Sequence, residues 1–224
     1  MKFKLYWDYS SKMHSTTFQS DWIEGDIILS FIDDVEKTGR VKDIRIEDET
    51  GLTWSKKELK KLLIKLEEEP DNLRLYFDAS FNKETYEAGY GIVLYYKLGK
   101  DEVRHRINAY TNSLNSNNEA EYAALYFALE QIKELKIKGK KLIIYGDSQG
   151  LLMQLKGDWP CYDENLNNWL NKIENKINEL NLYPEYQVIP RTQNKEADKL
   201  ANQALQNVSI DSKQVISVKG NVNE

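Results

Sequence analysis

The chain has 224 residues, of which 41% are hydrophobic and 11% aromatic, as in folded proteins of one large domain or two small ones. Its formal net charge of -5 and isoelectric point near 5.3 exclude a protein held on nucleic acid by bulk positive charge, but not a local binding site. The single cysteine, Cys161, excludes a disulfide scaffold. Because the chain also has neither a signal peptide nor a run of roughly 18 apolar residues, we expect a cytoplasmic protein with no membrane partner.

Residues 1–70 are predicted to form a small α+β domain of unknown role, and the sequence identifies no protein partner for it. Alternating and helical patterns predict strands at 3–7, 16–18, 41–46 and 52–54, and helices at 22–38 and 56–69. The acidic run that precedes Pro70 ends the second helix and predicts the domain boundary.

The second predicted domain, residues 71–207, opens with the strand 73–81, which reads LRLYFDASF. Apolar and polar side chains alternate along it, and Asp78 lies near its middle. A carboxylate in a buried strand needs a cation or hydrogen-bond donors, because an unpaired buried charge is costly. Asp78 is therefore the first candidate site residue.

Three more acids follow on predicted elements. Strands at 89–97 and 102–110 complete an antiparallel meander, and the helix 117–135 carries Glu121 on its apolar stripe. The strand 141–147 ends in Asp147, at the kind of strand end where active sites of parallel sheets lie. The next predicted elements are a helix to residue 155, a helix at 164–180 and a strand at 186–189. The last predicted helix is 194–206, with Asn194 as its expected cap and Asp198 near its first turn. Residues 208–224 are predicted to be a loose tail.

The predicted fold class is thus α/β, a mixed five-stranded sheet flanked by helices. Four carboxylates that converge on one point would repel one another, and divalent cations resolve that repulsion. Oxygen-only ligands favour Mg²⁺ or Mn²⁺. Two such ions would activate water and stabilise the charge on a phosphoryl group, which is the chemistry of phosphodiester hydrolysis.

Four motifs in this order resemble type 1 ribonuclease H: YFDAS (76–80), SNNEAEYAAL (116–125), GDSQ (146–149) and RTQNKEADKLA (191–201). The resemblance implies a ribonuclease H-like catalytic domain in which Asp78, Glu121, Asp147 and Asp198 are catalytic and hold two metal ions. It also implies cleavage of the RNA strand of an RNA/DNA hybrid.

The same resemblance implies substrate contacts. Asn117, Asn118 and Gln149 resemble residues that contact the hybrid in its minor groove. Ser116 resembles a residue near the DNA phosphate, and Arg191 resembles an arginine of relatives that lack a histidine before the last aspartate. Each is equally consistent with capping, loop or surface chemistry. Trp169 resembles an aromatic residue that lines the DNA channel, but a core position fits it at least as well.

Two departures from the family pattern leave alternatives open. Ala79 replaces the usual glycine after the first aspartate, and the segment 157–180 lacks the basic helix with which some relatives grip the hybrid. The alternatives to a nuclease are a module that binds hybrid or double-stranded RNA without cutting it, and a structural domain. Proofreading-type exonucleases and transposase-like enzymes fit the motifs less well.

Overall fold

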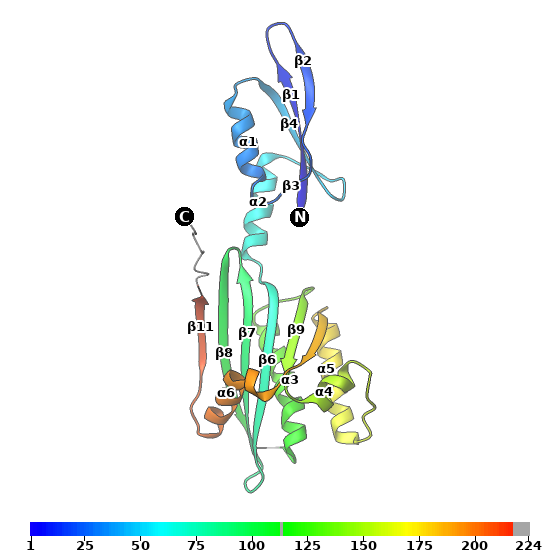
Figure 1. Cartoon of the computed structure of the whole chain (residues 1–224), viewed down its shortest axis with the longest axis vertical. Helices are drawn as coiled ribbons and strands as arrows, with labels where there is room; N and C mark the ends of the chain where they lie inside the picture. The colour runs from blue at the N-terminus through cyan, green and yellow to red at the C-terminus, as the bar shows by residue number, and fades with distance from the viewer. Residues whose placement is uncertain (113, 217–224) are drawn as a thin grey trace. The chain divides into compact units, whose positions relative to one another are not determined.

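The structure, a computed structural model, describes residues 1–112 and 114–216. The chain divides into two compact units, Met1–Glu68 and Glu69–Glu224, so that the division falls two residues before the expected boundary (Figure 1). No helix among the described residues is long and apolar enough to cross a bilayer.

The first unit is a five-stranded sheet with two helices. Its strands are β1 (Lys2–Ser10), β2 (Ser15–Gln19), β3 (Ile23–Glu24), β4 (Val41–Asp48) and β5 (Thr53–Trp54), and its helices are α1 (Ile28–Lys37) and α2 (Lys56–Glu68). The path β2-β1-β4-β5 forms the sheet, and β3 pairs with β1. Alternate residues of β1 and β4 and the apolar stripes of both helices build its core: Phe3, Leu5, Ile28, Ile32, Ile46 and Leu59.

The predicted helix start at residue 22 is wrong. The helix begins at Ile28, because Ile23 and Glu24 pair with the first strand and Gly25 follows them in a turn. A glycine inside a helix destabilises it by roughly 1 kcal/mol relative to alanine, so Gly25 disfavours a helix that starts before it. Trp22 is instead 45% exposed, and the ammonium of Lys4 lies 5.0 Å from its ring centre.

The second unit is a mixed α/β domain, which confirms the predicted fold class. Its strands are β6 (Asp71–Asn82), β7 (Glu87–Leu98), β8 (Asp101–Thr111), β9 (Lys141–Gly146), β10 (Tyr183–Val188) and β11 (Asp211–Ile216), in the order β10-β9-β6-β7-β8-β11. Its helices are α3 (Asn117–Glu134), α4 (Gln149–Leu155), α5 (Glu164–Glu179) and α6 (Lys195–Leu205), with a 3₁₀ turn, η1, at Arg191–Gln193. Strand β9 runs parallel to both β6 and β10, and the other pairs are antiparallel.

The sheet has six strands and not the five predicted, because part of the expected loose tail forms β11. This strand pairs antiparallel with β8 from Asp211 to Ile216. Asn108 of β8 holds the segment that leads into β11. Its side-chain amide donates to the carbonyls of Leu200 and Val208, and its side-chain oxygen accepts from the backbone amide of Ile210. The remainder of the predicted tail, residues 217–224, lies outside the described residues.

Helices cover the two faces of this sheet differently. Figure 1 shows α6 in front of the sheet and α3 behind it. One large apolar core joins the sheet to α3, α4 and α5. On the other face, α6 packs against glycines: a Cβ built on Gly91 would lie 2.0 Å from the carbonyl oxygen of Ala197, and one on Gly89 would lie 2.1 Å from that of Ala201. The close approach of α6 to β7 therefore requires glycine at both positions.

We expect Gly91→Ala to destabilise the second unit by about 1–3 kcal/mol, because the added methyl group forces α6 away from the sheet. Urea unfolding of the whole chain measures the change. The matched control is Gly150→Ala in α4, where an added Cβ meets no atom within 4 Å. That substitution should be neutral or stabilising, since alanine is the better helix former. Equal midpoints for the Gly91 variant and the wild type would contradict the packing described for α6.

Candidate functional site

Asp78 lies in the interior of β6 and is 3% exposed. It pairs across the sheet with Gly91, so its side chain is on the face that α6 covers. One carboxylate oxygen, Oδ1, accepts a hydrogen bond from the amide of Ala79 at 2.9 Å. The other, Oδ2, is buried and has no partner among the described residues. An unpaired buried carboxylate oxygen is costly, and it is the donor that a cation would satisfy.

Glu121 belongs to the second turn of α3, which Ser116 caps by accepting from the amide of Glu119 at 3.1 Å. Within the part of the chain that is described, its Oε2 is also buried without a hydrogen-bond partner. Glu121 interacts electrostatically with Asp78 and Asp147. Its predicted orientation, toward the sheet and away from water, agrees with these interactions.

Asp147 directly follows β9, and Asn194 holds it in place. The side-chain amide of Asn194 donates to Asp147 Oδ1 and to the backbone carbonyl of Phe77, both at 2.8 Å. These two bonds tie the turn before α6 to β6 and to the end of β9. Since Phe77 directly precedes Asp78, Asn194 positions two of the four acids relative to each other.

Asp198 lies in the first turn of α6 and forms an ion pair with Arg191 of the η1 turn. The guanidinium Nη2 of Arg191 donates to Asp198 Oδ1 at 2.7 Å, and the arginine side chain is 76% exposed. Arg191 also interacts electrostatically with Asp78 and Asp147, so this cation faces the whole group of acids.

The pKa values of Asp78 and Glu121 are raised. Burial and then the neighbouring charge of Asp147 raise the pKa of Asp78 to about 7, and Asp198 adds to the effect. Burial and then Asp78 raise the pKa of Glu121 to about 9. Four acids from four separate parts of the fold thus interact electrostatically, and two of them resist ionisation there.

The donor set fits a hard divalent cation, because the two unpartnered oxygens, Asp78 Oδ2 and Glu121 Oε2, are both carboxylate oxygens. The acids are not gathered tightly, however. Across residues 1–112 and 114–216, the structure holds no group of three or more His, Cys, Asp or Glu side chains placed to bind one ion. Asp147 and Asp198 instead have Asn194 and Arg191 as partners. A bound ion would therefore require the carboxylates to draw closer than they lie here.

The predicted substrate residues are located at helix starts beside these acids. Asn117 and Asn118 are exposed in the first turn of α3, and Gln149 is the exposed first residue of α4. The oxygen of Ser116 caps α3, which is the alternative role considered for it. Arg191 forms an ion pair with Asp198, so it is not an isolated surface arginine.

Two other predictions are settled by side-chain contacts. Trp169 is half-buried, its indole N–H donates to Glu119 Oε1 at 3.1 Å, and its ring packs against Tyr126, which agrees with the core alternative. Asn194 is the N-cap residue of α6, as predicted, but its side chain makes no capping bond among the described residues. Its reach to Asp147 makes Asn194 the residue that sequence reasoning missed, since asparagine before a helix has the same pattern in either role.

The fold and the acid group define an RNase H-like α/β domain. The sequence model of the reverse transcriptase-like family matches residues 76–204, more than half of the chain, and the chain belongs to that family. It is 43% identical over 196 residues to the uncharacterized protein YpeP of Bacillus subtilis (strain 168), covering 87% of this chain and 86% of that protein.

Among solved structures, the chain is similar to RNase H1 of the halophilic archaeon Halobacterium salinarum, with 26% identity and a TM-score of 0.52 over 60% of this chain and 98% of that one. LC11-RNase H1, isolated from compost, has 28% identity and a TM-score of 0.52, covering 61% of this chain and 97% of its own. The same enzyme in complex with an RNA/DNA hybrid matches with 26% identity and a TM-score of 0.52, covering 61% and 98%. These matches confirm the predicted resemblance to type 1 ribonuclease H.

The raised pKa values predict that metal-free protein loses stability as pH rises. Between about pH 4 and pH 7 the unfolded chain has released the proton of Asp78 while the folded chain keeps it, so the free energy of unfolding falls with pH. Glu121 extends the fall toward pH 9. We expect Asp78→Asn to flatten this dependence and to gain about 1–3 kcal/mol over the wild type at pH 8.

Urea unfolding at pH 5 and pH 8 in a chelator measures the effect. The exposed Asp158→Asn is the matched control, and it should keep the wild-type difference between the two pH values. A parallel fall in stability for wild type and Asp78→Asn would show that the Asp78 carboxylate is not destabilised by its surroundings.

Proposed function

We propose that the second unit is a metal-dependent endoribonuclease that hydrolyses the RNA strand of RNA/DNA hybrids. The observation that carries the proposal is the pair of buried, unpartnered carboxylate oxygens on Asp78 and Glu121, in a fold shared with RNase H1 enzymes. The hybrid complex of LC11-RNase H1 supports the choice of substrate. Burial of two acids without partners has no structural benefit, so it favours retention of the site for chemistry.

Two Mg²⁺ or Mn²⁺ ions, held by Asp78, Glu121, Asp147 and Asp198, would activate a water molecule and neutralise charge on the phosphoryl group. The protein's own contribution is positioning. Asn194 keeps one oxygen of Asp147 oriented and leaves the other oxygen for a ligand. Arg191, largely exposed and paired with Asp198, supplies a positive charge at the edge of the site where a phosphate can approach.

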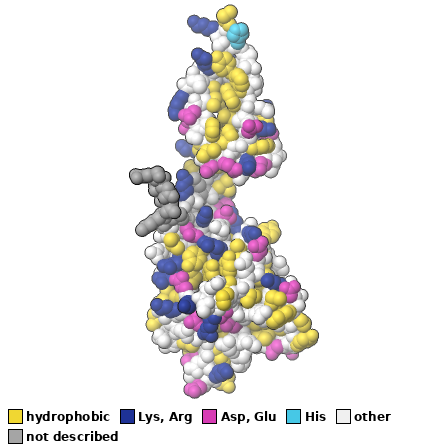
Figure 2. Space-filling view, in the orientation of Figure 1, with side chains coloured by type: hydrophobic (Ala, Val, Ile, Leu, Met, Phe, Trp, Pro, Cys, Tyr) yellow, Lys and Arg dark blue, Asp and Glu magenta, His cyan; other side chains and the backbone are white. Residues whose placement is uncertain are grey.

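Recognition of the hybrid relies on local polar contacts. Asn117, Asn118 and Gln149 present exposed amides, which can donate to and accept from 2′-hydroxyl groups and base edges in a shallow minor groove. Ser116 accepts its capping bond through the hydroxyl oxygen, and a hydroxyl can donate its hydrogen to a phosphate at the same time. Figure 2 shows acidic, basic and hydrophobic side chains interspersed over the visible face, with no continuous basic field. Binding should therefore be weaker and less salt-dependent than in relatives with a basic grip.

A second candidate function is a module that binds hybrid or double-stranded RNA without cutting it. The observation in its favour is that Asp147 and Asp198 already have partners, and that the described residues gather no three metal-binding side chains. Such a module would keep the exposed amides of α3 and α4 but not the metal site.

Incubation of the whole chain with a strand-labelled hybrid in Mg²⁺ and in Mn²⁺ tests the proposal. We expect cuts in the RNA strand alone, and a loss of at least about 100-fold in Asp147→Asn, because even residues that only orient a metal ligand contribute 10–100-fold. The exposed Asp158→Asn is the control and should retain full activity.

Three outcomes separate the candidates. Absence of RNA cleavage in both metals, or undiminished cleavage by Asp147→Asn, would reject the nuclease. Salt-sensitive binding of hybrid or duplex RNA without cleavage would establish the binding module. If no nucleic acid binds at low salt, neither candidate stands.

A further inference from the structure

Strand β2 leaves one edge of the sheet of the first unit open. It is the first strand of the path β2-β1-β4-β5, and all of its residues are exposed. Ser20, which follows the strand, donates its backbone N–H to the carbonyl of Leu5 in β1 at 2.9 Å. Backbone groups alternate in direction along a strand, so the even-numbered residues of β2 bond to β1. The odd-numbered residues therefore direct their N–H and C=O groups outward.

The other sheet edges carry features by which proteins prevent edge-to-edge pairing. Among the described strands, β5 has only two residues. Strand β10 contains Pro184 and Glu185, and β11 contains Asp211 and Lys213. Strand β2 reads STTFQ, with neither a charge nor a proline. Its edge is therefore open to another strand in a way that the other edges are not.

An exposed aromatic side chain adjoins this edge. Phe18 is 46% exposed, and its ring stacks on Trp7 with ring centres 5.5 Å apart. It also meets the ring of Tyr9 edge-on at 6.0 Å. Because so much of Phe18 faces water, a strand that paired with β2 would gain apolar burial as well as backbone hydrogen bonds.

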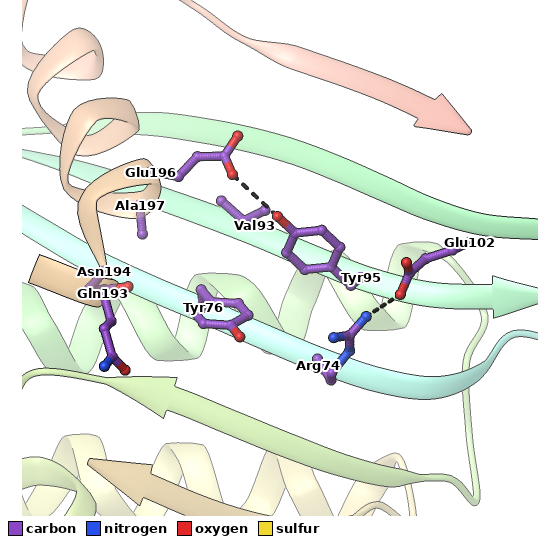
Figure 3. A pocket seen from close by; sticks show the side chains of 9 residues that line it. All are labelled: Arg74, Tyr76, Val93, Tyr95, Glu102, Gln193, Asn194, Glu196 and Ala197. Atoms are coloured by element: carbon purple, nitrogen blue, oxygen red, sulfur yellow. Dashed lines mark hydrogen bonds and ion pairs between the residues drawn. The ribbon is translucent and has the colours of Figure 1, made fainter. Parts of the chain in front are cut away.

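The cavity of the second unit offers no comparable surface. It measures about 350 Å³ and lies beside the start of α6 (Figure 3). Two of its polar side chains are already paired, since the hydroxyl of Tyr95 donates to Glu196 at 3.3 Å and the guanidinium of Arg74 pairs with Glu102. A ligand there would compete with these bonds, whereas a strand added to β2 meets backbone groups that point outward.

The sequence around β2 is complementary to itself in an antiparallel pair. Lys12 precedes the strand and Asp21 follows it, and both are exposed. Antiparallel pairing of two copies brings the end with Lys12 to the end with Asp21, whereas parallel pairing brings like charges together. The uncharged strand between these ends adds no repulsion. A second copy of the chain therefore fits this edge.

We propose that β2 pairs antiparallel with β2 of a second copy of this chain, about a two-fold axis at Thr17. Each Thr17 exchanges both backbone hydrogen bonds with its counterpart, and Ser15 does so with Gln19 of the second copy. Thr16 lies opposite Phe18 of the second copy, so the two Phe18 rings are diagonal neighbours on one face. The proposal does not depend on nuclease activity.

Such a dimer would hold two acid groups in one molecule, because each second unit is covalently joined to a first unit. Two weak sites that engage one hybrid bind it more tightly than either alone. This consequence, unlike the pairing itself, rests on the proposed function.

Sedimentation velocity of the whole chain over a range of concentrations tests the proposal. One strand pair buries little area, so we expect a reversible dimer with a Kd of about 1–100 μM. Thr17→Pro removes an outward N–H and leaves the bonds to β1, because proline is tolerated where an edge N–H faces solvent, and this variant should be monomeric. Thr17→Val keeps the N–H and is the matched control, with a Kd within about threefold of the wild type.

Two double variants test the register. In Ser15→Lys/Gln19→Glu each new charge faces an opposite charge of the second copy, whereas in Ser15→Lys/Gln19→Lys it faces a like charge. The two positions are roughly 13 Å apart within one chain, so the charges affect its fold little. We expect a Kd at least about tenfold lower for the first variant, because every charge pair occurs twice in a two-fold dimer.

Three outcomes would overturn the proposal. The first is a wild type that stays monomeric up to about 1 mM, which would leave the edge to a strand of a different protein. The second is a dimer that Thr17→Pro does not weaken, and the third is an equal Kd for the two double variants. Far-UV circular dichroism of each variant distinguishes loss of the dimer from loss of the fold.

Discussion

The second unit depends on the cost of one buried carboxylate. Asp78 is almost inaccessible to water, has one side-chain hydrogen bond within the described part of the chain, and lies between apolar residues in its strand. Removal of a carboxylate from water is costly unless a cation or several donors replace the lost hydration, and here one oxygen has no replacement. Glu121 adds a second such oxygen and the same sign of charge. Asp78 makes Glu121 harder to ionise, and Asp147 does the same to both, so the pair is tolerable only when protonated or neutralised.

The surrounding elements hold this unfavourable arrangement in place. Glycines in β7 let α6 approach the sheet closely, which brings Asp198 to the acid group. Asn194 ties the turn before α6 to the strand that carries Asp78 and to the end of β9. Arg191 supplies a cation that faces the acids. Since these contacts come from β6, β7, β9 and α6, a change in any one of these elements alters the spacing of the charges.

The acid group was predictable from sequence because its signals are local. An aspartate near the middle of a buried strand, a glutamate on the apolar stripe of α3 and an aspartate at the end of β9 are each visible in the local sequence. The role of Asn194 was not predictable, because a side chain that caps a helix and one that reaches 47 residues back along the chain look identical in sequence.

Strand β11 was missed for a different reason. Its sequence, DSKQVI, has four polar residues before its two apolar ones and no alternation. It is held instead by backbone pairing with β8, and its approach is set by Asn108 and by the bond from Asp211 to buried His105.

The face seen in Figure 2 has no continuous basic field, which alters how the site can select nucleic acid. A protein with net charge -5 gains little from release of counterions, so the identity of its target has to come from short-range contacts. The exposed amides at the starts of α3 and α4 can supply such contacts to a hybrid.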